Sequence, residues 1–439
     1  MSSTTSVNKI KFSNFKKETW ASVIFMGLGQ LMFKQFGRAI IYMLIEIGAL
    51  AYFITRGFED IIGFFTLGTE VANPWTGQSG DNSVMMLLMG VFAFIALSLF
   101  IILYVRNIRD AYETQLIVES GGQPATFKED LASMLDENFH KTALFFPLLG
   151  VFVFNILPII FMILIAFTNY GGEIQPPRLV DWVGLDNFQK ILTLEQFAPT
   201  FFKILVWNIT WAILSTVINF AVGIFVAVHF SSKNLKGKGI WRGFPILAMA
   251  TPGFITLIAF KFMFSYGGPI NQILVSNGFE AIGFLDVDAA WTARWIGILV
   301  NAWISSPSIV LIVTAMMSNI DHNIYEAADI DGAGKFRQFF SITLPHIIHT
   351  TTPILIGTFI GTFNNFGIFY FLRGGLYTEG YFLASDTDLL INWLYNLSIN
   401  NDYYSIGAAI SIIIFIFTAT FSLIVYVKSP AYREEGKYL

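Results

Sequence analysis

The stretch EAADIDGAGKFRQFFSITLP, Glu326–Pro345, is polar within a chain that is otherwise strongly apolar. Of the 439 residues, 55% are hydrophobic and 13% are charged, whereas soluble domains carry about 25% charged residues. The apolar residues gather into runs of about 20, the length that an α-helix needs to cross roughly 30 Å of hydrocarbon. Helices pair their backbone groups internally, which open sheets cannot do in lipid. The sequence therefore predicts an all-α polytopic membrane protein, with the quoted stretch between two of its spans.

We expect eight transmembrane helices, with boundaries near 37–56, 83–105, 143–168, 202–229, 244–264, 292–317, 347–371 and 405–427. The apolar segment 20–36 is short and contains glycine, so we expect it to be interfacial or re-entrant. Residues 1–141 then form an N-terminal cytoplasmic tail, two accessory helices and a cytoplasmic linker. Residues 142–428 form a six-helix core, and residues 429–439 form a cytoplasmic tail.

Lysine and arginine predict the orientation. With the N-terminus inside, the inner segments hold 19 basic residues and the outer segments hold 4, as the positive-inside rule requires. The N-terminus lacks an apolar core followed by a small-residue cleavage site, so we expect a cytoplasmic tail there and not a cleaved signal. Both termini and the stretch Glu326–Pro345 are thus expected on the cytoplasmic side of the plasma membrane. The chain has no cysteine, and we expect no bound metal and no nucleic-acid partner.

The middle of the stretch, DGAGKF, looks like part of a phosphate-binding loop, but its spacing excludes one. Such a loop needs Ser or Thr directly after Gly-Lys to hold magnesium, and a first glycine five residues before the second. Here Lys335 is followed by Phe336, and Asp329 stands where the first glycine is needed. The sequence carries no Walker motif elsewhere. We therefore expect that this chain is not itself the ATPase, has no catalytic residue and binds no cofactor.

The same residues predict two short helices outside the membrane, at 324–328 and 335–344. Gly332 and Gly334 supply the freedom that the turn between them needs, and Pro345 marks where the second helix bends or ends. An apolar stripe at helical spacing runs along the second helix, at Phe336, Phe339, Phe340 and Thr343. A groove on a partner protein would bury such a stripe. An interfacial amphipathic loop is the alternative.

The pattern E-A-A, three residues, G, nine residues, I-x-L-P resembles the signature of the membrane subunits of binding-protein-dependent ABC importers. The chain matches it at Glu326, Ala327, Ala328, Gly332, Ile342, Leu344 and Pro345. In that family this EAA loop, here 324–345, docks in a cleft of the ATPase subunit, and the six-helix core has the type I importer fold. The resemblance implies a coupling role for Glu326, Ala327, Ala328, Asp331, Gly332, Phe339, Leu344 and Pro345. Glu326 would be a polar anchor and Gly332 the turn.

Four further segments resemble the F-type permease subunit (MalF) of maltose and maltodextrin importers. They are AFTNY at 166–170, VGLDNF at 183–188, TFNNF at 362–366 and TDLLINWLYNLSI at 387–399. Gram-negative members carry a large domain between the third and fourth spans, and the short connection here, about 169–200, implies a Gram-positive source. The implied partners are a homologous MalG-type permease, two ABC ATPases that bind ATP and magnesium, an extracellular sugar-binding protein and the oligosaccharide.

A sugar site in a membrane needs amides and hydroxyls, which the sixth and seventh spans supply at Asn301, Ser305, Ser306, Ser308, Thr362, Asn364 and Asn365. The spacing 301, 305, 308 puts three of them on one helix face. Alternatively such groups only join helices, at about 0.6 kcal/mol per hydrogen bond. The resemblance implies sugar-facing positions at Asn301, Ile304, Ser305, Ser308, Gly361, Thr362 and Asn365. Ser308 and Gly361 replace aromatic residues of the family, which predicts a wider pocket for longer or different oligosaccharides than maltose.

Four ionisable residues lie within the expected spans, where a charge costs about 2.5–3.5 kcal/mol. His229, Lys261 and Arg294 lie near span ends, and we expect them to extend to the interface. Glu46 is more central, and a structural hydrogen bond is favoured there over proton coupling.

Taken together, these features predict the permease subunit of an ATP-driven importer of maltodextrin- or maltose-type oligosaccharides. Another oligosaccharide, of the galacto-oligosaccharide or raffinose type, is the main alternative. An ion-coupled secondary sugar transporter predicts intramembrane carboxylate pairs and inverted repeats, and a membrane scaffold predicts no coupling motif. The single central Glu46 and the lack of a visible repeat count against the secondary transporter. The proline-containing spans and the signature at 326–345 count against the scaffold.

Overall fold

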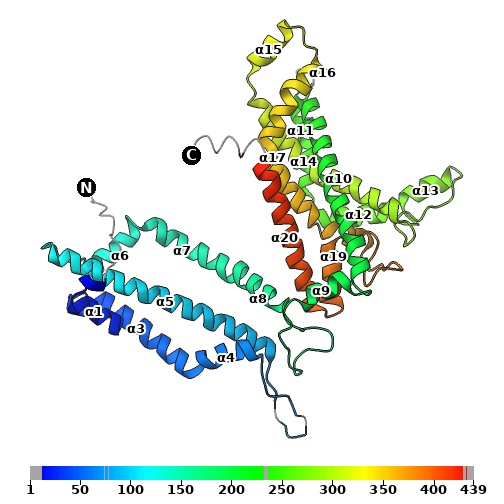
Figure 1. The fold of residues 1–439 in the computed structure, drawn as a ribbon. Coiled ribbons are helices and arrows are strands. Elements are labelled where there is room, and N and C mark those ends of the chain that lie inside the picture. The colour runs from blue at the N-terminus through cyan, green and yellow to red at the C-terminus, as the bar shows by residue number, and fades with distance from the viewer. Residues whose placement is uncertain (1–11, 74, 78, 232–235, 429–431, 433–439) are drawn as a thin grey trace. The chain divides into compact units, whose positions relative to one another are not determined.

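The computed structural model describes residues 12–428 and 432, apart from 74, 78 and 232–235 (Figure 1). In this described part the chain is helical, and its β-structure is confined to isolated bridges, so the predicted all-α fold is confirmed. Contacts divide the chain into two compact units, Met1–Val183 and Gly184–Leu439. Residues 1–11 of the predicted N-terminal tail, and the predicted tail 429–439 apart from Tyr432, lie outside the described residues. The predicted functional division after residue 141 stays a prediction.

Unit 1 contains the first three expected spans. Its helical elements are η1 (Phe12–Asn14), α1 (Lys17–Ile24), α2 (Leu28–Met32), α3 (Phe36–Tyr52), η2 (Phe53–Gly57), α4 (Phe58–Thr66), α5 (Ser83–Glu119), α6 (Phe127–Leu135), α7 (Phe139–Val151), η3 (Phe152–Ile156) and α8 (Leu157–Ile165). The elements η2 and η3 are π-helical turns that join α3 to α4 and α7 to α8. Each of these pairs therefore runs as one long helix.

The segment 20–36 forms α1 and α2, which are too short to cross a membrane and pack against α5 and α3. The buried Asn107 of α5 donates to the carbonyl oxygen of Ser22 at 3.0 Å and accepts from the backbone N–H of Gly27 at 3.0 Å. Glu46 of α3 accepts a hydrogen bond from the backbone N–H of Met26. The predicted structural role of Glu46 agrees with this geometry.

Unit 2 contains the remaining spans. Its helical elements are α9 (Asp186–Thr193), α10 (Ala198–Ser231), α11 (Lys238–Ala250), α12 (Gly253–Met263), α13 (Pro269–Ser276), α14 (Ala290–Ser318), α15 (His322–Ile330), α16 (Lys335–Gln338), η4 (Phe339–Thr343), α17 (Leu344–Phe363), α18 (Gly367–Arg373), α19 (Leu390–Tyr395), η5 (Asn396–Asn400) and α20 (Tyr404–Lys428). The long helices α10, α14 and α17 pack together.

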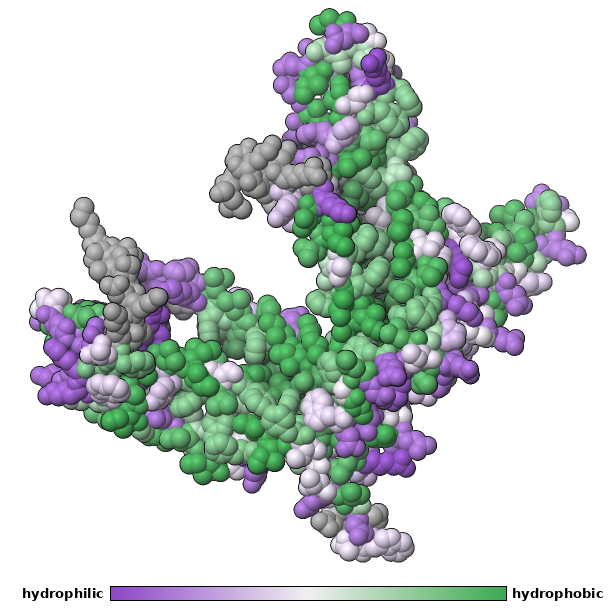
Figure 2. Space-filling view, in the orientation of Figure 1, coloured by the Kyte–Doolittle hydropathy of each residue, from purple (hydrophilic) through white to green (hydrophobic). Residues whose placement is uncertain are grey.

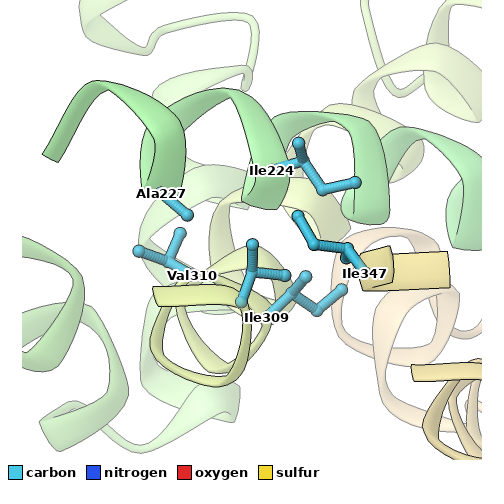
Figure 3. Packing of buried hydrophobic residues seen from close by; sticks show 6 residues of the cluster. Ile224, Ala227, Ile309, Val310 and Ile347 are labelled. Carbon is cyan, nitrogen blue, oxygen red and sulfur yellow. The ribbon is translucent and has the colours of Figure 1, made fainter. Parts of the chain in front are cut away.

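The packing of α10 on α14 forms the core of unit 2. Figure 3 shows Ile224 and Ala227 of α10 facing Ile309 and Val310 of α14, with Ile347 of α17 closing the cluster. All of these side chains are at most 5% exposed. Burial of each large aliphatic side chain contributes about 1.5–3 kcal/mol in water, but between membrane helices the gain comes from close packing instead.

Seven helices of the described part are long and apolar enough to cross a membrane, where the sequence predicts eight. The difference lies at the expected span 244–264, which forms two shorter helices, α11 and α12. They meet at Thr251, whose backbone is extended (φ −88°, ψ 127°), because the residue before a proline avoids the helical region. Pro252 then precedes the first turn of α12. The predicted fifth span is therefore divided into the helices α11 and α12.

Apolar side chains cover the outside of the long helices in each unit, as the green surface of Figure 2 shows. Phe154 is 79% exposed and Phe225 64% exposed, which would be unfavourable in water and is favourable in lipid. Hydrophilic residues gather around α15 and α16 and around the loops at the other end of unit 2. Because seven helices of the described part are long and apolar enough to cross a membrane, this is a multi-pass membrane protein.

A buried arginine ties several loops of unit 2 together. The side chain of Arg373, at the end of α18, is 1% exposed and pairs with Asp386 at 2.7 Å. Its Nε and Nη2 donate to the carbonyl oxygens of Leu285, Asp286 and Val287 at 2.7–3.1 Å. The Nη1 that pairs with Asp386 also donates to the hydroxyl of Thr387 at 3.1 Å. The guanidinium of Arg373 is therefore paired entirely with groups of the protein.

Replacing Arg373 by leucine is expected to destabilise unit 2 by about 3–5 kcal/mol, because Asp386 loses its buried counter-charge. The matched control is Lys190→Leu, which removes the exposed Lys190–Asp186 pair, worth at most about 0.5 kcal/mol. Thermal unfolding of the detergent-purified protein measures both. Equal melting temperatures for the two variants would contradict the role assigned to Arg373.

Candidate functional site

The seventh span is interrupted at residues 364–366, between α17 and α18. The polar run Thr362–Asn365 lies at this break. A helix that stops within a membrane leaves carbonyl and N–H groups without intrahelical partners, and each unpaired group costs several kcal/mol in lipid. The break must therefore be held by other hydrogen bonds.

Helix α10 satisfies the last carbonyls of α17. The amide of Asn208 donates to the carbonyl oxygen of Phe363 at 3.0 Å, and the indole N–H of Trp211 donates to that of Thr362 at 2.9 Å. The Oδ1 of Asn208 also accepts from the backbone N–H of Leu390 at 2.7 Å. Asn208 and Trp211 are fully buried, so these bonds lock α10 to the break.

On the other side of the break, Asn392 of α19 donates to the carbonyl oxygen of Phe366 at 2.8 Å. The Oδ1 of Asn365 accepts from the backbone N–H of Ile368 at 3.2 Å and so caps the start of α18. Sequence reasoning missed Asn208, Trp211 and Asn392. For Asn208 and Asn392 the available signal is an asparagine within an apolar run, whereas Trp211 gives no such signal. Only the fold shows which carbonyl each side chain faces.

Three of the predicted sugar-facing residues are brought together at this break. The Oδ1 of Asn301 in α14 accepts from the hydroxyl of Ser305 at 3.3 Å and from the amide of Asn365 at 3.5 Å. The hydroxyl of Ser308 donates to the carbonyl of Ser305 at 2.8 Å. We call Asn301, Ser305 and Asn365 the polar cluster.

The other predicted sugar positions are placed differently. Thr362 is 6% exposed and its carbonyl belongs to the helix break, Ile304 is half-buried, and Gly361 is exposed with open space around it. Asn301 itself is 1% exposed. In this conformation Asn301 therefore orients its two neighbours, while Ser305 and Asn365, which are half-buried, are the members that a ligand could reach.

Two contacts show how α10 is aligned against α14 beside the polar cluster. The guanidinium carbon of Arg294 lies 4.3 Å from the ring centroid of Trp207, and a Cβ on Gly223 would lie 2.5 Å from the Cγ2 of Ile309. The sequence predicts that Arg294 extends to the interface. The first pair shows instead that its guanidinium is held within the protein, against the ring of Trp207. Together the two pairs show that α10 and α14 run in the same direction, with Trp207 at the level of Arg294 and Gly223 at the level of Ile309.

This register puts Ser215 of α10 level with Asn301, and Asn219 level with Ser305. Ser215 and Asn219 are fully buried, and neither side chain has a hydrogen-bond partner in the described part of the chain, nor does the Nδ2 of Asn301. Unpaired buried amides cost about 1–3 kcal/mol each. The layer between the two helices is therefore polar and weakly held at the level of the polar cluster.

The second candidate site is the loop that joins α14 to α17. α15 ends at Ile330, a turn follows, and α16 continues through the π-helical turn η4 into α17. One alternative of the prediction is that the helix ends at Pro345, but it continues. Pro345 follows the π-helical turn η4, and irregular turns of this kind are where a proline is accommodated within a membrane helix. The chain is thus helical from Lys335 to Phe363.

The predicted apolar stripe on this segment is divided between two faces. Phe339 packs on the core cluster and Thr343 is buried, so these two positions face inward. Phe336 is 79% exposed and Phe340 50% exposed, with ring centroids 4.6 Å apart. Ile330 of α15 is 87% exposed. The exposed apolar surface therefore includes Phe336, Phe340 and Ile330, and the prediction of one stripe that also holds Phe339 and Thr343 is corrected.

The residues predicted to couple the loop to a partner differ in accessibility. The exposed ones are Glu326, Ala327, Asp331, Gly332 and Pro345. The half-buried ones are Ala328, Phe339 and Leu344.

An ion pair across the turn shapes the loop. The ammonium of Lys335 lies 3.0 Å from a carboxylate oxygen of Asp329, and the amide of the buried Gln338 donates to the same oxygen at 2.5 Å and to the carbonyl of Ala333 at 2.9 Å. Lys335 and Gln338 together hold the pKa of Asp329 below its usual value. The turn is therefore pre-organised.

The two glycines of the turn are not equivalent, although the sequence predicts the same role for both. Gly332 has φ +74°, a left-handed conformation that costs a residue with a Cβ about 1–2 kcal/mol. Gly334 has φ −63° and ψ 159° at the start of α16, which any residue can adopt. Only Gly332 needs to be glycine.

Gly332→Ala is expected to lower ATP-coupled transport severalfold, because the strained turn changes the angle between α15 and α16. Gly334→Ala, the matched control, is expected to behave as the wild type. Both variants are compared by transport rate at equal membrane expression. A similar defect in both, or in neither, would contradict the requirement for a left-handed residue at 332.

Comparisons with known proteins bear on both sites. A family model described as "Binding-protein-dependent transport system inner membrane component" matches residues 219–433. The chain is 33% identical over 420 residues to the galactooligosaccharides transport system permease protein GanP of Bacillus subtilis, covering 94% of this chain and 97% of that protein. It is 33% identical over 424 residues to the maltodextrin transport system permease protein MalC of Streptococcus pneumoniae, covering 94% and 95%.

Among solved structures, a chain of a bacterial ABC transporter involved in the import of the acidic polysaccharide alginate is similar. It aligns with a TM-score of 0.55 and 22% identity, covering 68% of this chain and 97% of that chain. At this identity the likeness shows a common fold.

Proposed function

Because the chain belongs to the inner-membrane components of binding-protein-dependent transport systems, we propose that it is the permease subunit of an ATP-driven importer of maltodextrin- or maltose-type oligosaccharides. One observation carries the proposal: amide and hydroxyl groups meet at a helix break inside the membrane, in Asn301, Ser305 and Asn365. Such groups pair with sugar hydroxyls, while the similarity to a maltodextrin permease over 94% of the chain names the sugar class.

The proposed mechanism is alternating access driven from the cytoplasmic loop. A partner ATPase closes on the loop 324–345, with Glu326 as polar anchor and with Phe336, Phe340 and Ile330 filling its cleft. Since the chain is helical from Lys335 to Phe363, roughly 40 Å at 1.5 Å per residue, a displacement of the loop is transmitted along α17 to the break. The polar cluster lies at the end of that lever. No bond of the sugar changes.

The proposal assigns the remaining parts to other chains. The sequence carries no ATPase motif, so ATP and magnesium are bound by two ABC ATPase subunits. A homologous MalG-type permease completes the pathway, and an extracellular sugar-binding protein delivers the oligosaccharide. The 19 basic residues expected on one side and the 4 expected on the other support the proposal that both termini are cytoplasmic. The short connection between the third and fourth spans supports a Gram-positive source.

A galacto-oligosaccharide is the second candidate substrate. The relative GanP is as similar to this chain as the maltodextrin permease. Gly361, which has open space around it, is compatible with either sugar. Both series therefore belong in the test.

Uptake of labelled maltotriose by cells with and without this chain tests the proposal. Uptake is expected to depend on the chain, to stop when ATP is depleted, and to persist when the proton gradient alone is collapsed. Unlabelled maltodextrins and galacto-oligosaccharides serve as competitors. Chain-dependent uptake that follows the gradient while ATP stays high would contradict an ATP-driven importer.

A further inference from the structure

A cavity of about 460 Å³ lies at the outer end of unit 2, between α12, α18 and η5. This volume is in the range of small-molecule sites. Its walls are lined by Ile258 and Lys261 of α12, Tyr370 and Phe371 of α18, and Asn396 and Asn400 of η5. Aromatic rings, amides and one cation therefore face a common space, which none of the roles assigned above explains.

The ring of Tyr370 is held in place from behind. It stacks on Phe366 with centroids 4.5 Å apart at 30°, and meets Tyr395 edge-on at 5.6 Å. Phe366 in turn contacts Tyr395 at 5.0 Å. Because Tyr370 is nevertheless 37% exposed, it presents a fixed aromatic surface to the cavity. A ring in this position offers its face to the C–H groups of a sugar.

The polar groups of the cavity have hydrogen-bonding capacity left. The amide of Asn400 donates to the Oδ1 of Asn396 at 3.0 Å, which orients both amides and leaves the Oδ1 of Asn400 as an acceptor. The ammonium of the exposed Lys261 has no hydrogen bond or ion pair with the described residues, and it offers up to three donors. Donors and acceptors in this mixture suit a polyhydroxylated ligand.

The cavity lies close to the polar cluster in sequence and in space. Phe366, on which Tyr370 stacks, directly follows Asn365. A Cβ on Gly367 would lie 3.8 Å from both the Oδ1 of Asn365 and the Cδ1 of Leu257, one residue before Ile258 of the cavity wall. One turn of α18 thus separates the two sites.

A second cavity of unit 2 shows that this lining is not a general property of the helices. That cavity, of about 480 Å³ on α20, is lined by Ile413, Ile416, Phe417, Thr420, Phe421 and Ile424. It is almost entirely apolar, as expected of a surface that faces lipid. The cavity at Tyr370 is polar and aromatic at comparable size.

We propose that the cavity at Tyr370, Lys261 and Asn400 is an outer sugar subsite, which holds the second part of an oligosaccharide whose first part lies at Ser305 and Asn365. The inference rests on the proposed function and deepens it. The stacking surface that Ser308 and Gly361 lack beside the polar cluster is supplied here by Tyr370, one turn further out. The subsite makes the permease selective for chain length, because only a sugar long enough to occupy both sites gains the contact with Tyr370.

The test measures maximal uptake rates for sugars of two to five units, at saturating sugar so that delivery by the binding protein is not limiting. Wild type is first given the glucan and the galactan series, and the series that it transports is then used for the variants. Tyr370→Leu removes the ring, Tyr370→Phe keeps it, and Tyr266→Leu removes an exposed tyrosine of the same outer region, 65% exposed, that does not line the cavity.

With Tyr370→Leu, the rate for four- and five-unit sugars relative to the two-unit sugar is expected to fall about fivefold, the size of one aromatic contact. Tyr370→Phe and Tyr266→Leu are expected to keep the wild-type ratio. An equal loss at every chain length, or no loss at any, would overturn the subsite alone. Wild type that transports neither series would overturn the proposed function, and this inference with it.

Discussion

The backbone groups freed where the seventh span breaks are the constraint on which unit 2 depends. No water is available in a bilayer to pair them, so Asn208, Trp211 and Asn392 donate to the carbonyls of residues 362, 363 and 366. These three side chains come from α10 and α19, and their bonds fix where both helices lie against α17. The break that gathers Asn301, Ser305 and Asn365 is stable only because its neighbours complete its hydrogen bonds.

A continuous helix connects the two candidate sites, the loop 324–345 and the break at residues 364–366. Between the turn at Gly332 and the break, α16, η4 and α17 form one uninterrupted helix, and its inward residues Phe339 and Ile347 belong to the core against α10 and α14. A motion of the loop therefore cannot be absorbed locally. The layer beside the polar cluster, where Ser215 and Asn219 lack partners, is the least tightly bonded part of the α10–α14 contact and the natural place for the helices to shift.

Much of this architecture could be predicted from the sequence, because membrane helices are encoded by long apolar runs and the loop by a spaced motif. The family predicted from Glu326–Pro345 is confirmed by the comparisons, and seven helices long enough to span are found near their predicted positions. The split at Thr251–Pro252 was not predicted, since prolines are also tolerated within continuous membrane helices. The different roles of Gly332 and Gly334 depend on φ angles that composition does not reveal.

The burial of Asn301 and the inward orientation of Phe339 were beyond a sequence argument for another reason. Helical spacing identifies which residues share a face, but it does not tell which neighbour covers that face. Asn208 and Asn219 illustrate this, since both are buried asparagines of α10. The amide of Asn208 is bonded at both ends, to Phe363 of α17 and to Leu390 of α19, whereas the amide of Asn219 is bonded at neither end within the described part of the chain.

The most direct measurement compares sugar uptake and ATP hydrolysis in the assembled transporter, reconstituted in vesicles with its sugar-loaded binding protein, for wild type and Asn365→Leu. The account predicts that the variant loses most sugar uptake while ATP hydrolysis is still stimulated by the binding protein, because the substitution removes the polar cluster and the bond of Asn365 to Ile368 but leaves the loop 324–345 unchanged. Wild-type uptake in the variant would contradict the claim that the oligosaccharide passes through the polar cluster at the helix break.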